Sequence, residues 1–205
     1  MKLFPFVLPP LENNNYLLID EVSKEAALID CSHYSQKVLD VLATEGVELK
    51  YILLTHAHFD HILGVQDMVK ATGAKVLLHT DDLALLKKLN SYTMMVGLPE
   101  TEVPTVNEFI QDGAVLRLGE QEIKVLHTPG HTEGGCSFFV QNMLFSGDTL
   151  FQESIGRTDL EGGDFSTLKN SIETKIYTLS EDTKVYPGHG PSTSIEHEKK
   201  FNSYI

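Results

Sequence analysis

The sequence is poor in cysteine and lacks long apolar runs. Only two of its 205 residues are cysteine, Cys31 and Cys136, which is too few for a disulfide framework, and neither lies in a C-x-x-C pair. We therefore expect both to be small buried apolar residues of a cytoplasmic protein. No apolar run approaches the roughly 18 residues that a membrane span requires. The opening residues, MKLFPFVLPP, contain three prolines and no small-residue cleavage site, so we expect no secretory signal.

Basic residues are also scarce. The chain has 16 Lys and Arg against 29 Asp and Glu, which gives a formal net charge of -13. Because such a field repels polyanions, we expect neither nucleic acid nor anionic membranes as partners, and a small molecule as the substrate. The hydrophobic content of 41% suffices for a core, and no linker interrupts the chain, so we expect one domain over residues 1–205. The sequence gives no indication of oligomeric state.

Strand-like and helix-like segments alternate along the chain, which favours a layered α/β fold. The expected strands cover residues 15–20, 26–30, 50–54, 75–79, 114–118, 122–127, 136–140, 142–146 and 183–187. The expected helices cover residues 33–45, 62–72, 81–89, 164–179 and 192–200. The irregular segment 90–109 is apolar at Tyr92, Met94, Met95 and Leu98, which fits either a lid or, as we favour, a packed connector.

Histidine and aspartate follow four of the expected strands. Each strand ends in a tight turn that contains glycine or proline or, after YILL, in the polar segment THAHFDH, and each turn presents side chains able to bind a metal. These side chains are His56, His58, Asp60 and His61 after the strand 50–54, His131 after 122–127, Asp148 after 142–146, and His189 after 183–187. Any one of them alone would be read as a surface residue or a turn cap, but seven at strand ends indicate a common site.

The spacing inside THAHFDH indicates two metal ions. From extended backbone, His56 and His58 can face the same way, whereas the adjacent Asp60 and His61 must diverge and suit a second ion close by. A chance arrangement of this kind is expected on the order of once in a thousand such chains. The other histidines are expected outside the site: His127 to brace its turn, and His79, His33 and His197 as surface or capping residues without companions.

With these motifs in place, the chain resembles the metallo-β-lactamase-fold hydrolase superfamily, and within it the short glyoxalase II-like proteins. The resemblance runs through NNNYLLID, THAHFDH, HTPGHTEGG, SGDTLF, SIGRTDLEGGD and VYPGHGPSTS, in the order of the family. It implies an αββα four-layer sandwich with the site at one edge of the two sheets. It also implies that His56, His58 and His131 hold one metal, that Asp60, His61 and His189 hold the other, and that Asp148 bridges them.

The resemblance implies a metal-dependent hydrolase of the hydroxyacylglutathione hydrolase type. β-Lactamases of this fold generally lack the bridging aspartate, so Asp148 disfavours antibiotic hydrolysis, and the acidic charge disfavours the nucleases of the superfamily. Only 16 residues follow His189, so we expect no C-terminal helical domain of the kind that holds glutathione in full-length glyoxalase II. Persulfide dioxygenases share an element similar to GRTDL and use a single iron, for which His56, His131 and Asp148 would suffice. They are the main alternative, followed by a non-catalytic metal-binding module.

The expected mechanism uses a hydroxide held between two divalent metals to attack the thioester carbonyl. Asp60 and Asp148 are the expected catalytic residues, Asp60 both as ligand and in orienting the hydroxide. Arg157 is expected either to bind a substrate carboxylate or to form an ion pair with Asp159 or Asp164. Zinc is the expected metal, and a donor set of five imidazoles and two carboxylates without thiolate also suits iron or manganese.

Overall fold

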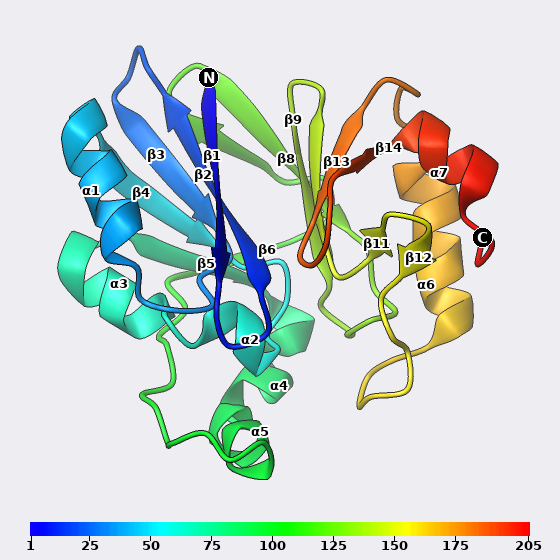
Figure 1. Cartoon of the computed structure of the whole chain (residues 1–205), viewed down its shortest axis with the longest axis horizontal. Coiled ribbons are helices and arrows are strands. Elements are labelled where there is room, and N and C mark those ends of the chain that lie inside the picture. Colours follow the sequence, from blue (N-terminus) through cyan, green and yellow to red (C-terminus); the bar gives the residue numbers. More distant parts are fainter.

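Two six-stranded sheets face each other in the computed structural model, which describes residues 1–205 (Figure 1). The first sheet has the order β1-β2-β3-β4-β5-β6, antiparallel from β1 to β3 and parallel from β3 to β6. Its strands are β1 (Lys2–Leu8), β2 (Asn13–Asp20), β3 (Glu25–Ile29), β4 (Glu48–Leu53), β5 (Lys75–His79) and β6 (Glu108–Ile110).

The second sheet has the order β14-β13-β10-β9-β8-β7, with β10 and β13 parallel and the other pairs antiparallel. Its strands are β7 (Val115–Leu118), β8 (Gln121–His127), β9 (Cys136–Val140), β10 (Met143–Gly147), β13 (Lys184–Pro187) and β14 (Thr193–Ser194). A separate two-stranded ribbon pairs β11 (Leu150–Phe151) with β12 (Ser154–Ile155).

Helices cover the outer face of each sheet (Figure 1). α1 (Gln36–Glu45) and α3 (Val65–Thr72) lie outside the first sheet, and α6 (Phe165–Ser171) and α7 (Ile195–Phe201) lie outside the second. Short helices gather at one end of the sheets: α2 (Phe59–Ile62), α4 (Leu83–Lys87) and α5 (Leu89–Met95). The 3₁₀ turn η1 (Thr80–Asp82) precedes α4, and the π-helical turn η2 (Ile172–Ile176) continues α6. The expected αββα four-layer sandwich is therefore confirmed.

Three hydrophobic clusters correspond to the three interfaces between these layers. Strand β2 shows how one strand contributes to two of these clusters. All eight of its residues are buried, and successive side chains point to opposite faces of the sheet. Leu17 and Ile19 pack in the cluster that contains the buried residues of α1 and α3, whereas Tyr16 and Leu18 pack in the cluster between the sheets. A third cluster joins the second sheet to α6, η2 and α7. A strand buried on both faces has to be apolar without alternation, as LLI in NYLLID is.

All nine expected strands are present, and the differences from expectation have local causes. Strand β1 was not predicted; it contains Pro5 and forms the edge of its sheet, which is where a strand tolerates proline. The expected helix 62–72 is divided at Gly64, where a Cβ would lie 2.2 Å from the backbone carbonyl carbon of His33. The segment 90–109 is not irregular throughout, since it contains most of α5 and part of β6.

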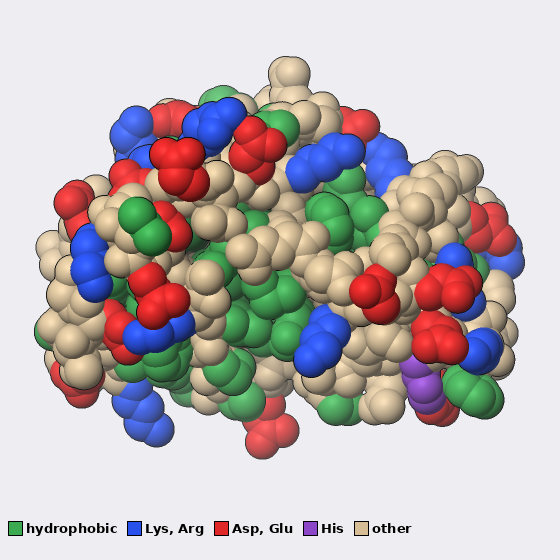
Figure 2. Space-filling model, turned by 90° about the horizontal axis from the view of Figure 1, so that it is seen from above, with side chains coloured by type: hydrophobic (Ala, Val, Ile, Leu, Met, Phe, Trp, Pro, Cys, Tyr) green, Lys and Arg blue, Asp and Glu red, His purple; other side chains and the backbone are tan.

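The surface is of mixed character. Seen from above, acidic and basic side chains are interspersed, with hydrophobic side chains visible between them (Figure 2). Both cysteines are buried and unpaired, as expected. None of the helices combines the length and the apolar character needed to cross a membrane.

Candidate metal centre

The four strand-end loops named from the sequence meet at the end of the sheets where α2 lies (Figure 1). Strands β4, β8, β10 and β13 each lead directly into one of these loops, as predicted. The structure brings together all seven predicted ligands, which are His56, His58, Asp60, His61, His131, Asp148 and His189. Their donor atoms form three overlapping groups of three, within each of which every atom lies within 4.8 Å of the others. Their duty as metal ligands stays a prediction.

The first group contains His56, His58 and His131. Nδ1 of His58 lies 2.9 Å from Nε2 of His131, and the ring of His56 lies edge-on to both, with centroids 4.8 Å away. The second group contains Asp60, His61 and His189, with Nε2 of His189 lying 3.1 Å from Oδ2 of Asp60. These are the two ligand sets that the family resemblance implied.

Asp148 lies between the two groups. Its Oδ2 is 3.6 Å from Nε2 of His131 in the first group and 3.8 Å from Nε2 of His189 in the second. Its Oδ1 is 3.4 Å from Nε2 of His61. One carboxylate thus faces imidazoles of both groups, which is the position that a bridging ligand requires.

Hydrogen bonds behind the cluster determine which ring nitrogen faces inward. Nδ1 of His61 donates to Asp30 at 2.8 Å, and Nδ1 of His131 donates to the carbonyl of Arg157 at 2.7 Å. Thr55 Oγ1 donates to Asp30 and can therefore accept from Nδ1 of His56, 3.0 Å away. Because each Nδ1 is held in one of these pairs, Nε2 is the nitrogen that each of the three rings presents to the site.

The cluster has the properties of a cation site. Nε2 of His56 and Oδ1 of Asp148 are buried and have no hydrogen-bond partner, which is costly for polar atoms unless a ligand satisfies them. Burial lowers the pKa of His58 to about 3, with repulsion from His131 adding to the effect, so this imidazole is neutral at pH 7. Burial raises the pKa of Asp148, but the neighbouring His61 outweighs it, and the net pKa is lowered. Burial lowers the pKa of His61, but the carboxylates of Asp148 and Asp30 outweigh it and raise the pKa well above its usual value, so a metal would take the place of a proton on this imidazole. Imidazoles beside ionised carboxylates are a donor set that divalent metals bind, so the residues fit such a group.

Two glycines allow this close approach. A Cβ on Gly188 would lie 2.3 Å from Oδ1 of Asp148 and 2.8 Å from Cε1 of His61. A Cβ on Gly156 would lie 1.8 Å from the carbonyl oxygen of Asp148. Gly188, the first glycine of GHG, and Gly156 of IGR are therefore required by the packing of the cluster rather than by turn formation alone.

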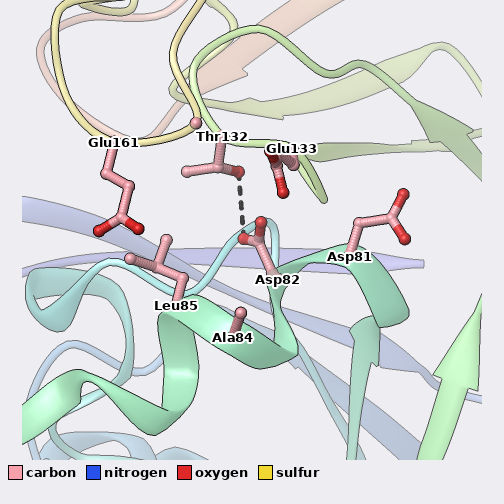
Figure 3. Close-up of a pocket in the computed structure, with 8 residues that line it drawn as sticks. Asp81, Asp82, Ala84, Leu85, Thr132, Glu133 and Glu161 are labelled. Carbon is pink, nitrogen blue, oxygen red and sulfur yellow. Dashed lines mark hydrogen bonds between the residues drawn. The ribbon is translucent and has the colours of Figure 1, made fainter.

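The sequence interpretation missed two buried carboxylates behind the ligands. Asp30 binds Thr55 and His61, as described above. Asp82 accepts hydrogen bonds from the N–H of Ala57 at 2.8 Å and the N–H of Gly134 at 2.7 Å. It also accepts from the hydroxyl of Thr132 at 3.1 Å (Figure 3). Ala57 lies between His56 and His58, and Thr132 follows His131. Asp82 therefore connects, through hydrogen bonds, the two loops that carry the first group of ligands.

The asparagines of NNNYLLID were also given no role. The side chain of Asn14 donates to the carbonyls of Pro187 and Gly190 at 3.0 and 2.8 Å, on either side of His189. Nδ2 of Asn13 lies 2.9 Å from Nε2 of His61. A run of three buried asparagines in a buried strand was the available signal, because buried amides need partners.

The remaining histidines lie outside the seven. His127 braces its turn as expected, with Nε2 2.9 Å from the carbonyl of Glu133. The expectation that His79 has no companion is wrong, because its ring stacks on His127 with centroids 4.0 Å apart. His79 also caps η1 by accepting from the N–H of Asp81. This contact joins residues 48 positions apart, so local spacing could not reveal it.

The sequence profile of the metallo-beta-lactamase superfamily matches residues 9–189. The chain belongs to this superfamily. Among its relatives, the probable metallo-hydrolase YqgX of Bacillus subtilis is 36% identical, over 100% of this chain and 98% of the relative. The hydroxyacylglutathione hydrolase GloC of Haemophilus influenzae is 34% identical, over 93% of this chain and 92% of the relative.

Solved structures of the superfamily are similar over almost the whole chain. The BLEG-1 B3 metallo-beta-lactamase has a TM-score of 0.91 and 38% identity, over 99% of both chains. TTHA1623, crystallised in a di-iron-bound form, has a TM-score of 0.88 and 37% identity, over 98% of this chain and 100% of the other. ETHE1 from Myxococcus xanthus has a TM-score of 0.82 and 28% identity, over 99% of this chain and 84% of the other.

The cluster opens into a cavity of about 560 Å³. His58, Asp60, His131, Asp148 and His189 are exposed to it. Arg157 lines the same cavity, but its guanidinium binds Asp159 through two hydrogen bonds of 2.8 and 2.7 Å. The structure therefore shows the ion pair that was one of the two expectations for Arg157, and substrate binding by this residue stays a prediction.

Proposed function

We propose that this metallo-hydrolase cleaves thioesters, in the manner of glyoxalase II, with two divalent metal ions per chain. The observation that carries the proposal is the position of Asp148, whose carboxylate faces His131 of one ligand group and His61 and His189 of the other. The similarity to a hydroxyacylglutathione hydrolase over 93% of the chain supports the choice of thioester.

Two complete ligand sets support the metal stoichiometry. His56, His58 and His131 would hold one ion, Asp60, His61 and His189 the other, and Asp148 both. Such ions lower the pKa of water and polarise a carbonyl oxygen, which is the chemistry that thioester hydrolysis needs. The donor set accepts zinc, iron or manganese, and the di-iron form of TTHA1623 keeps iron among the candidates beside zinc.

The residues of the chain orient the reaction. Asp30, Thr55 and the carbonyl of Arg157 hold three imidazoles with Nε2 toward the ligand cluster. Asp60 is 6% exposed at the floor of the cavity, where its carboxylate can accept a proton from a water molecule beside it. The thiolate product is a good leaving group, so no residue is needed to protonate it.

The main alternative is a persulfide dioxygenase with a single iron, and the similarity to ETHE1 is compatible with it. Such a site would use His56, His131 and Asp148. It would leave His58, Asp60, His61 and His189 without a metal, although Asp60, His61 and His189 converge as closely as the other groups do. This surplus of ligands favours the binuclear hydrolase over the dioxygenase and over a non-catalytic metal-binding module.

Metal analysis combined with activity measurements separates these functions. We expect about two metals per chain in protein purified without added metal, and loss of thioester absorbance on incubation with S-lactoylglutathione or another acyl thioester. One iron per chain with oxygen consumption on adding glutathione persulfide would establish the dioxygenase instead. Bound metal without turnover of any substrate would indicate a non-catalytic metal-binding module, and absence of tightly bound metal would indicate an interaction module. A β-lactam should be tested as a substrate beside these compounds, because the similar protein BLEG-1 is a B3 metallo-beta-lactamase.

A further inference from the structure

The cavity above the metal ligands has apolar walls. They are contributed by segments that are far apart in the chain: the turn after β1, α5, the β11–β12 ribbon and the loop that follows it. The apolar wall residues include Leu11, Met95, Val96, Phe151, Ile155 and Leu160. Met95 is 81% exposed, and Leu11 and Val96 are also exposed. These apolar side chains surround a polar floor and remain in contact with water. Covering them with an apolar part of a ligand is favourable, because it removes apolar surface from water.

These walls offer no unpaired positive charge. Arg157 is the only basic residue that lines the cavity, and Asp159 neutralises it through a bidentate pair. Lys88, on the segment before α5, binds Glu161, which also accepts from the hydroxyl of Tyr92 at 3.0 Å. Glutathione carries two carboxylates and one ammonium group at neutral pH, so binding it would require a cation that these walls do not provide.

We propose that this cavity selects thioesters whose non-reacting arm is apolar and uncharged, in preference to hydroxyacyl thioesters of glutathione. The inference rests on the proposed thioester hydrolysis and names the substrate class of the same site. The thioester carbonyl lies over the ligands at the floor, and the apolar arm lies against α5 and the β11–β12 ribbon.

Four thioesters test the preference. Lactoyl and hexanoyl groups are each joined to glutathione and to N-acetylcysteamine, which is a small neutral thiol. We expect kcat/KM to be highest for hexanoyl-N-acetylcysteamine and at least about tenfold lower for lactoylglutathione, since each buried methylene contributes up to about fourfold. Comparing the two acyl groups on the same thiol shows the preference on the acyl side of the thioester bond. Comparing the two thiols with the same acyl group shows the preference on the thiol side. The highest kcat/KM for lactoylglutathione would overturn the proposal.

Two neighbouring methionines provide a matched pair of variants. Met95 lines the cavity, whereas Met94 is exposed on the same helix and lies outside it. We expect Met95→Lys to lower kcat/KM for hexanoyl-N-acetylcysteamine by about five- to tenfold and to raise it for lactoylglutathione. Met94→Lys should change both by less than about twofold. Equal effects of the two substitutions would show that this wall does not contact the substrate.

A binding measurement separates this inference from the proposed function. Thioethers cannot be hydrolysed, so titration calorimetry with the hexyl and methyl thioethers of N-acetylcysteamine and of glutathione reports on the walls alone. We expect the hexyl compounds to bind at least about tenfold more tightly than the methyl compounds, with no advantage for glutathione. Tight binding without thioester turnover would overturn the proposed function and leave the apolar site standing. Thioester turnover together with tighter binding of the glutathione compounds would overturn this inference and leave the proposed function standing.

Discussion

The carboxylate of Asp30 accepts the Nδ1–H of His61 at 2.8 Å, and neither side chain is more than 2% exposed. The same carboxylate accepts from the N–H and the hydroxyl of Thr55, both at 2.8 Å. Since Thr55 in turn contacts Nδ1 of His56, one buried aspartate orients an imidazole in each ligand group.

We therefore expect Asp30→Asn to weaken metal binding. The amide nitrogen would face the Nδ1–H of His61, donor against donor, and would favour the tautomer that has no lone pair on Nε2. Loss of such a partner typically lowers metal affinity by about 10- to 100-fold, and the group containing His61 should lose its metal first. Competition with a chromophoric chelator measures the two affinities. Asp40→Asn, at an exposed position of α1, is the control, and an unchanged affinity in Asp30→Asn would contradict the role of Asp30.

Asp82 offers a test of how the ligand loops are held together. Asp82→Ala removes three hydrogen bonds and leaves the buried N–H groups of Ala57 and Gly134 without partners. We expect the free energy of unfolding to fall by about 2–4 kcal/mol. Asp81→Ala is a matched control, because Asp81 is the adjacent aspartate and is exposed. Thermal unfolding of both metal-free variants decides the point, and equal melting temperatures would exclude the bracing role.

The strand-end pattern predicted the ligands because it depends on local structure. A buried strand that ends in a tight turn places the next polar side chain at the edge of the sheet, and four such edges coincide in this fold. Asp30 satisfies the same criterion, since it directly follows β3, but it was assigned to the strand itself. Asp82 could not be found in this way. Its partners Thr132 and Gly134 are about 50 residues away, and nothing in their sequence separation predicts the contact.

The wall of the cavity shows a similar limit. The apolar residues of segment 90–109 indicated that it packs against other parts of the chain. Tyr92 packs against the core and also lines the cavity, whereas Met95 and Val96 line the cavity from exposed positions. One short helix therefore serves as connector and as wall. The two roles differ only in the direction of the side chains, which depends on how α5 is docked rather than on its composition.

Asp148 and His127 separate the metal ligands from the residues that brace their loops. We expect Asp148→Ala to deplete both metals and abolish turnover, because its carboxylate lies between the two groups. His127→Ala should keep most of the metal, because its ring binds the carbonyl of Glu133 and the ring of His79 rather than the cluster. Elemental analysis of the two purified variants measures the difference. Equal metal loss from both would show that the ligand set is wrong.

Glu161 joins the two sides of the cavity mouth. Its carboxylate accepts from Lys88 and from the hydroxyl of Tyr92, and thereby ties the loop after β12 to the segment that contains α5. We expect Glu161→Gln to leave the melting temperature almost unchanged, because exposed ion pairs add little stability. Hydrogen exchange in α5 should nevertheless become faster, and KM for an apolar thioester should rise several-fold with kcat unchanged.

Glu102 provides the comparison for this last effect. It also binds two partners across separate segments, accepting from Gln66 and from Lys70 at 2.9 and 2.8 Å, but it lies outside the cavity lining. Glu102→Gln removes a similar pair of exposed contacts from the connector that follows α5, so it controls for a general loosening of this region. A rise in KM that is confined to Glu161→Gln means that the position of α5 over the metal ligands determines how tightly the arm of the substrate is held. A rise common to both variants would assign the effect to the flexibility of the whole connector.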